Sequence, residues 1–141
     1  MKRNLIGTLS LVALSMLLAT GANAQSAAAK ADVPFAFTAW KTDLPAGCYV
    51  IRQIGQLNAV TIQDCQTHRS VLSPIQGTYT RDTQTKLVFH RIGEQYFLSQ
   101  IRGVNGGGMA LPASKLEKEM QMADSAPNGA HDSEMITIAL K

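Results

Sequence analysis

The sequence predicts a mainly β protein, an antiparallel β-barrel or β-sandwich of about seven or eight strands with one short helix near the C-terminus. From Val33 onward the chain is divided into short runs rich in β-branched and aromatic residues, and Pro, Gly and Asn separate these runs as turn signals. Only "LPASKLEKEM" combines a capping pattern with helical spacing. This pattern fits a closed barrel and a stacked sandwich equally well.

The first 24 residues have the layout of a secretory signal peptide. A basic start at Lys2 and Arg3 precedes an apolar run over residues 5–19, and small residues at 22–24 form a cleavage site. A membrane anchor is the alternative, but the run is shorter than the roughly 20 apolar residues that a spanning helix needs. The sequence therefore predicts a secreted or periplasmic protein that has no membrane span after cleavage of the signal.

Removal of the signal leaves a chain long enough for one domain but too short for two. We expect a flexible leader over residues 25–32, which are small and polar, and a single β domain over residues 33–141. The formal charge of +3 falls to +1 because Lys2 and Arg3 leave with the signal. The remaining sequence has no basic cluster with interleaved aromatics, so the composition predicts no nucleic-acid partner.

The first strand of the domain is "VPFAFTAW", in which Val33, Phe35 and Phe37 share one face. Pro34 lies near the start of this strand, where its missing amide donor does least harm. A turn at residues 45–47, "PAG", leads into the second run, "CYVIRQI". We therefore expect the sheet to begin at Val33.

The second run forms a hairpin with the segment that follows it. If the numbers of opposite residues add up to 113, Ile51 lies opposite Ile62 and Cys48 lies opposite Cys65. A two-residue loop at Gln56-Leu57 would put the cysteines at a narrow site, with α-carbons about 4.5 Å apart, and a four-residue loop at a wide site of about 5.5 Å. A disulfide spans either distance.

Whether these two cysteines form a structural disulfide depends on the cellular compartment in which the protein folds. An even number of cysteines in an exported protein favours a structural bond. A redox site would show Cys-x-x-Cys, and a structural zinc site would need four ligands at close spacing; neither pattern is present. We therefore predict a disulfide between Cys48 and Cys65.

A second hairpin is centred on Gly93-Glu94, a pair that suits a type II′ turn. In this register the numbers of opposite residues add up to 187, so Phe89 meets Leu98 and His90 meets Phe97. Both faces of the hairpin carry large apolar groups. We therefore expect this pair of strands to lie at the centre of the sheet.

The remaining elements are shorter. "RSVLSPI", "TYT" and "EMITIAL" are predicted strands, and the isoleucines and the last leucine of "EMITIAL" are expected to face inward. "GVNGGGM" is predicted to be a flexible loop, because it lacks the Lys and Ser/Thr of a phosphate-binding loop. In the helix, Ser114 and Glu117 have the spacing of a capping box, and Leu116 and Met120 share one face.

Several segments of the mature chain form a recognisable set: "VPFAF", "LPAG" followed by "YVI", "KLVFHRIGEQYFLSQI" and "LPASKLEKE". Together they resemble a family of short exported proteins of unknown function that occur in many copies in soil bacteria. The resemblance implies a compact β domain and supplies no activity, cofactor or ligand. The cysteines depart from the family pattern, in which the position before Tyr49 is usually not Cys, so the resemblance assigns them no family function.

Four residues are candidates for a binding site. His90 and Arg91 lie mid-hairpin with Tyr96 opposite Arg91, and a pocket over this polar pair is one interpretation. Trp40 is a candidate for the mouth of such a pocket. The alternative is that the polar residues are hydrogen-bonded structural groups and that the aromatic residues belong to the core or its rim.

The methionines raise the possibility of a metal carrier. Met120 and Met122, with Met109, Met135 and His131 elsewhere, offer soft ligands for copper(I) in an exported protein. Methionine is more often core filler, so the sequence assigns no metal site.

The sequence shows few residues in arrangements that are typical of catalytic sites. Ser70, Ser73 and Ser99 lack the context of a nucleophile elbow, and no pair of carboxylates faces inward. We therefore predict no enzyme and no cofactor. The predicted function is a non-catalytic binding or structural module of the cell envelope, whose partner is an unidentified envelope or extracellular ligand. The alternative is a periplasmic carrier of a small ligand or of copper(I).

Overall fold

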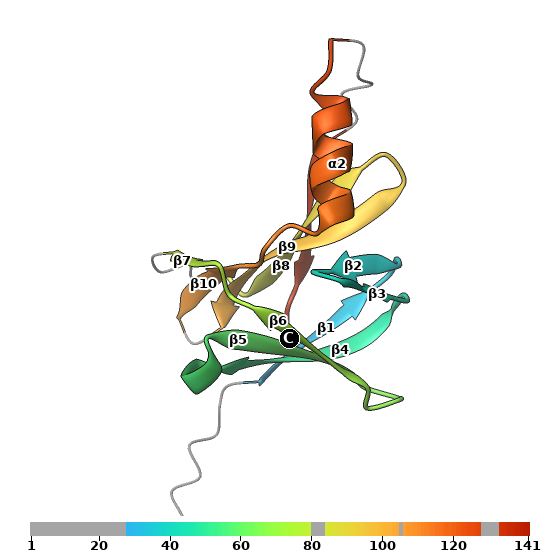
Figure 1. Cartoon of the computed structure of the whole chain (residues 1–141). Helices are drawn as coiled ribbons and strands as arrows, with labels where there is room; N and C mark the ends of the chain where they lie inside the picture. The colour runs from blue at the N-terminus through green and yellow to red at the C-terminus, as the bar shows by residue number, and fades with distance from the viewer. Residues whose placement is uncertain (1–27, 80–83, 105, 128–132) are drawn as a thin grey trace, which may run out of the picture.

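A computed structural model describes residues 28–79, 84–104, 106–127 and 133–141 (Figure 1). These residues form two sheets, antiparallel except for one parallel pairing, and one α-helix, α2 (Lys115–Asp124). The predicted signal peptide, residues 1–24, lies outside the described residues. Within the described part of the chain, no helix has the length and apolar character needed to cross a membrane.

The first sheet has four strands in the order β1-β4-β5-β6. Their bounds are β1 (Ala28–Val33), β4 (Gly47–Ile54), β5 (Ala59–Asp64) and β6 (Ser70–Pro74). The second sheet has the path β11-β8-β9-β10-β7. Its strands are β7 (Gly77–Tyr79), β8 (Lys86–Ile92), β9 (Gln95–Val104), β10 (Gly107–Ala110) and β11 (Ser133–Ala139). A short hairpin of β2 (Phe37–Ala39) and β3 (Thr42–Leu44) joins the second sheet where β2 pairs with β9 in parallel.

The two sheets enclose one hydrophobic core, and neither sheet closes on itself. Side chains from both sheets are fully buried in this core, among them Tyr49 and Ile51 of β4 and Phe89 and Ile101 of the second sheet. The fold is therefore sandwich-like, and the prediction of a mainly β protein with one helix near the C-terminus is confirmed. The described residues contain eleven strands rather than seven or eight, because β1 lies mostly in the predicted leader, β10 lies mostly in the predicted loop, and β3 lies in a segment for which no element was predicted.

The predicted flexible leader over residues 25–32 is wrong from Ala28 onward, because Ala28–Asp32 belong to β1. This strand pairs with β4 along its whole length. Ala29 and Ala31 face the core while Lys30 and Asp32 face solvent, so the alternation is carried by alanine, which is a weak strand signal. The C-terminus adds two backbone hydrogen bonds between Lys30 and Lys141, of 3.1 and 2.8 Å.

The predicted single strand "VPFAFTAW" is divided between the two sheets. β1 ends at Val33 in the first sheet and β2 begins at Phe37 in the second, so the chain crosses between sheets at residues 34–36. Pro34 follows the last residue of β1, where its missing amide donor ends the ladder. Phe35 stacks on Tyr96 with 4.0 Å between ring centroids, which fixes the crossing against the second sheet.

The cysteine hairpin has the predicted register, in which Ile51 faces Ile62. A disulfide joins Cys48 to Cys65, as predicted. The loop is the four-residue alternative: a 3-10 turn over Gly55–Leu57 is followed by Asn58 in the left-handed region, with a φ of 44°. The cysteine α-carbons are accordingly 5.4 Å apart, and the amide of Cys65 donates to the carbonyl oxygen of Cys48.

A tight turn follows the disulfide. The amide groups of Gln66 and Thr67 donate to Oδ1 of Asp64 at 2.7 and 2.8 Å. These backbone hydrogen bonds hold the pKa of Asp64 below its ordinary value, because they favour the charged carboxylate. In the turn between β5 and β6, the carboxylate of Asp64 thus accepts hydrogen bonds from two backbone amides.

The β8–β9 hairpin is at the centre of its sheet, as predicted, and Phe89 faces Leu98 as expected. The register changes by one residue between Val88 and Phe89, so Val88 faces Gln100 rather than Ser99. This bulge leaves Ser99 without an opposite partner on β8. The predicted pairs are therefore right from Phe89 to Ile92 and wrong over residues 86–88.

Most described residues of the segment "GVNGGGM" belong to strands rather than to the predicted flexible loop. β9 extends to Val104 and β10 begins at Gly107. Gly103 has a φ of +79°, and a β-carbon there would lie 2.6 Å from the α-carbon of Thr85. Glycine is therefore required at this position both by the backbone conformation and by the neighbouring chain.

The last strand behaves as predicted: Ile136, Ile138 and Leu140 pack against the core. The helix begins as predicted, because the hydroxyl of Ser114 accepts a hydrogen bond from the amide of Glu117 at 3.0 Å. Its inward face is not the predicted one, however. Leu116 is 45% exposed, and Glu117 is the buried residue of the helix.

Loss of the disulfide should lower the stability of the fold. We expect the double variant Cys48→Ser, Cys65→Ser to lose about 3 kcal/mol of unfolding free energy in urea, because the unfolded chain regains the entropy of an open loop. The oxidised wild-type chain, unfolded under the same conditions, is the control. A thiol titration that finds two free sulfhydryl groups in unreduced, denatured protein would contradict the bond itself.

Two of the three positive-φ glycines among the described residues, Gly93 and Gly103, provide a matched pair of substitutions. Gly93→Ala, at a φ of +59° with nothing near the new β-carbon, should cost about 1 kcal/mol. Gly103→Ala should cost about 2–4 kcal/mol, because the new methyl group also meets the backbone of Thr85. Urea unfolding of both variants measures the difference, and equal losses would show that the contact with Thr85 is absent.

Candidate functional site

The polar centre of the molecule is His90, which connects the second sheet to the helix. Its Nδ1 lies 3.2 Å from Oε1 of Glu117 and 3.0 Å from Nε2 of Gln121. Its Nε2 lies 2.6 Å from the hydroxyl of Ser133 at the start of β11. The amide of Gln121 also donates to Oε1 of Glu117 at 3.3 Å. Nδ1 therefore either donates to Glu117 or accepts from Gln121, depending on where the imidazole proton lies.

The sequence places these groups by strand alternation and helical spacing. His90 follows Phe89, whose ring is fully buried in the core, so the imidazole lies on the opposite face of β8. Glu117 and Gln121 are four residues apart and share one face of α2. Because Ser114 caps the helix, the first turn is fixed at the point where Glu117 meets His90.

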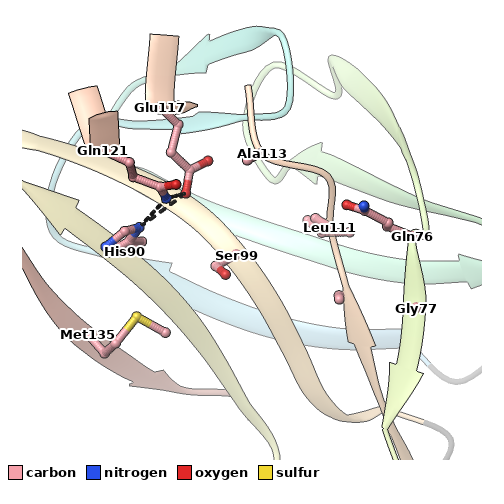
Figure 2. Close-up of a pocket in the computed structure, with 10 residues that line it drawn as sticks. Gln76, Gly77, His90, Ser99, Leu111, Ala113, Glu117, Gln121 and Met135 are labelled. Atoms are coloured by element: carbon pink, nitrogen blue, oxygen red, sulfur yellow. Dashed lines mark hydrogen bonds and ion pairs between the residues drawn. The ribbon is translucent and has the colours of Figure 1, made fainter. Parts of the chain in front are cut away.

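A cleft of about 550 Å³ opens beside this network (Figure 2). Its polar lining comes from His90, Glu117 and Gln121, with Ser99 at the bulge and Gln76 before β7. Its apolar and small lining residues are Gly77, Ala110, Leu111, Ala113 and Met135. The cleft thus combines a few convergent polar groups with an apolar wall, which is typical of sites for small molecules.

Ser99, the bulge residue, lies at the cleft and also pairs with the chain beyond β10. Its carbonyl oxygen accepts a hydrogen bond from the amide of Leu111 at 2.9 Å. This bond continues the β9–β10 pairing by one residue past Ala110, the last residue of β10. Leu111 is thereby held beside Ser99, and both residues line the cleft.

The four sequence-predicted binding residues do not form one site. Arg91 faces Tyr96 as expected, but this pair lies on the core side of β8–β9, where Tyr96 stacks on Phe35. The Nε of Arg91 donates to the carbonyl oxygen of Gly93 at 2.9 Å. Only His90 lines the large cleft, because neighbouring residues of a strand point to opposite faces.

The other two candidates lie elsewhere. Tyr96 lines a second, smaller cleft of about 250 Å³, together with Phe37 and Leu116. Trp40 occupies the turn between β2 and β3 with a φ of 54°, and the ammonium group of Lys41 lies 4.5 Å from the centroid of its ring. The hypothesis of one pocket bounded by Trp40, His90, Arg91 and Tyr96 is therefore wrong.

A hydroxyl, an imidazole and a carboxylate stand in a row at Ser133, His90 and Glu117. Serine hydrolases use this order of groups to activate the hydroxyl. Here the amide of Gln121 competes for Nδ1, and Ser133 is not among the residues that line the cleft. We interpret the row as the hydrogen-bonded support that attaches the helix to the sheet.

The methionines proposed as copper(I) ligands are dispersed. Met135 faces His90 across the β11–β8 ladder and lines the cleft, whereas Met109 is buried in the core and Met122 is exposed on the helix. His131 lies outside the described residues. Across the described ranges, no three or more His, Cys, Asp or Glu side chains are grouped so as to hold a metal ion.

Sequence reasoning missed Glu117, Gln121 and Ser99 as site residues. Glu117 was expected only as half of a capping box, and the apolar pair Leu116 and Met120 offered an equally good inward face at the same spacing. The polar pair at positions 117 and 121 was the available signal. Nothing in the sequence around Ser99 marks the bulge, because no Gly or Pro adjoins it.

No protein-family model, curated protein or solved structure matches the chain. The resemblance to short exported proteins of soil bacteria therefore remains a prediction.

The buried carboxylate should be important for attaching the helix. We expect Glu117→Ala to lose about 1–3 kcal/mol of unfolding free energy, because His90 and Gln121 lose a charged partner. Amide hydrogen exchange should accelerate in α2 and stay unchanged in β8 and β9. Glu119→Ala is the matched control: its exposed pair with Lys115 should contribute at most about 1 kcal/mol. Equal effects of the two variants would contradict the role of Glu117.

Proposed function

We propose that this chain is an exported, non-catalytic binding module of the cell envelope, and that the cleft between α2 and the second sheet is its binding site. The observation that carries the proposal is the convergence of a buried carboxylate, an imidazole, a hydroxyl and two amides on one cleft with an apolar wall. Leu111 is the one described residue lining the cleft that also belongs to the hydrophobic core between the two sheets, so the cleft is not a defect of core packing.

Export is supported by two independent features. The first 24 residues have the three parts of a signal peptide. The Cys48–Cys65 bond is of the kind that persists in oxidising compartments outside the cytoplasm. We therefore assign the module to the periplasm or the extracellular space, where its ligand would be an envelope component or a small molecule.

A small-ligand or copper(I) carrier is the second candidate. The pairing of Met135 with His90 across two strands, both lining the cleft, favours it, since thioether and imidazole are ligands for copper(I). Met135 is the only methionine among the residues that line this cleft. The small-ligand form of the carrier is therefore better supported than the metal form.

A blocked cleft tests the proposal. Ala113→Phe should fill the opening, while Ala123→Phe places the same ring on an exposed part of the helix and is the matched control. In a ligand-observed NMR screen of small fragments of mixed charge, we expect hits that shift the amide resonances of Ser99 and Leu111. These hits should be lost in Ala113→Phe and kept in Ala123→Phe.

Two results would contradict the binding function. One is a screen in which the shifted amide groups are scattered over the surface. The other is a set of hits that Ala113→Phe leaves unchanged. A titration with copper(I) that leaves the Met135 methyl resonance unmoved would remove the metal form of the carrier.

A further inference from the structure

We infer that the cleft binds small primary amines, and that Glu117 holds the ammonium group. This inference rests on the proposed binding function and names the chemical class of the ligand. It follows from three features: the burial and hydrogen bonding of the Glu117 carboxylate, the charges of the residues around it, and the acceptor atoms that line the cleft.

Glu117 is a buried carboxylate with one oxygen in use. Its side chain is only 6% exposed. Oε1 receives the contacts from His90 and Gln121, whereas Oε2 has no hydrogen-bond partner among the described residues. No buried side-chain oxygen in the described part lacks a partner, so Oε2 keeps access to the cleft. In Figure 2 this second oxygen points away from His90, toward the side where Ala113 lies.

None of the described residues that line the cleft is a permanent cation that could pair with this oxygen. The residues that line the cleft include no Lys and no Arg, and His90 is their only ionisable base. A carboxylate withdrawn from water is costly unless it gains charged or hydrogen-bonded partners. A ligand that brings a positive charge to Oε2 therefore replaces the favourable interactions with water that the carboxylate loses on burial. An anionic ligand would be repelled.

The acceptor arrangement selects an ammonium over other cations. A guanidinium group is bound best by both oxygens of one carboxylate, and Oε1 is already occupied. A divalent metal would need several oxygen or nitrogen ligands, and the described residues hold no such group. An ammonium has three single donors, one of which suits Oε2, and the polar side chains of Ser99 and Gln76 line the same cleft.

The rest of the cleft selects an apolar body for the ligand. Leu111, Ala113 and Met135 line it, and they offer contacts to a short hydrocarbon chain. A suitable pair of probes is therefore n-pentylamine and pentan-1-ol. The two molecules have the same chain length and differ in the charge of the head group.

The experiment is an NMR titration of the oxidised mature chain at neutral pH with each probe separately. We expect n-pentylamine to bind at least about tenfold more tightly than pentan-1-ol, because a charge-assisted hydrogen bond replaces a neutral one. Glu117→Gln should abolish this preference. Glu119→Gln, on an exposed face of the same helix, should retain it. In the wild-type protein, the methylene next to the ammonium should show nuclear Overhauser contacts to the side chain of Glu117, a readout that needs no variant.

Each other outcome overturns the inference in a distinguishable way. Equal binding of amine and alcohol in the cleft would leave the binding function intact and remove the preference for amines. Amine binding that survives Glu117→Gln, or contacts to a different surface, would remove Glu117 as the binding group. No binding of either probe would also overturn it, and the fragment screen with Ala113→Phe would then decide separately whether the cleft binds anything.

Discussion

The ring of Phe37 holds the two sheets together. It lies edge-on to Tyr49 of the first sheet and to Phe89 of the second, with 5.2 Å between centroids in each case. Phe35 makes the same edge contact with Phe89. Because the chain crosses from one sheet to the other at residues 34–36, immediately before Phe37, the aromatic cluster fixes both the crossing and the inward face of β8. The outward position of His90 follows, since strand residues alternate in direction.

The cleft arises where two regular patterns are interrupted. The bulge leaves Ser99 without an opposite partner on β8, while its carbonyl oxygen binds the amide of Leu111 and extends the β9–β10 pairing by one residue. Ser114 then starts the helix, and the helix rises away from the sheets instead of lying flat on them (Figure 1). A helix attached by its first turns leaves open space beside it, and the polar groups of that turn become the lining. Bulges often serve to redirect side chains next to binding sites.

Pairing rules explain which parts of this fold could be read from the sequence. The register that faces Cys48 with Cys65 was predictable because the apolar positions of both strands agree with it. β1 was missed because its inward residues are alanines, whose burial depends on an existing sheet edge rather than on their own preference. The inward face of the helix was missed for the opposite reason: local spacing favoured Leu116, but the tertiary partner is the imidazole of His90. Interactions between segments far apart in sequence therefore decided the site.

The attachment of the helix is polar where an apolar contact would have served stability at least as well. Replacing a buried polar contact by packed hydrophobic groups is often neutral or stabilising, so the contact between His90 and Glu117 is not explained by stability alone. Leu116 stands one position away from Glu117 and is 45% exposed, and a rotation of the helix by about 100° would exchange the two. What the observed arrangement provides is a fixed carboxylate oxygen facing the cleft. If the cleft binds a ligand, a polar attachment of the helix through Glu117 is expected in place of an apolar one.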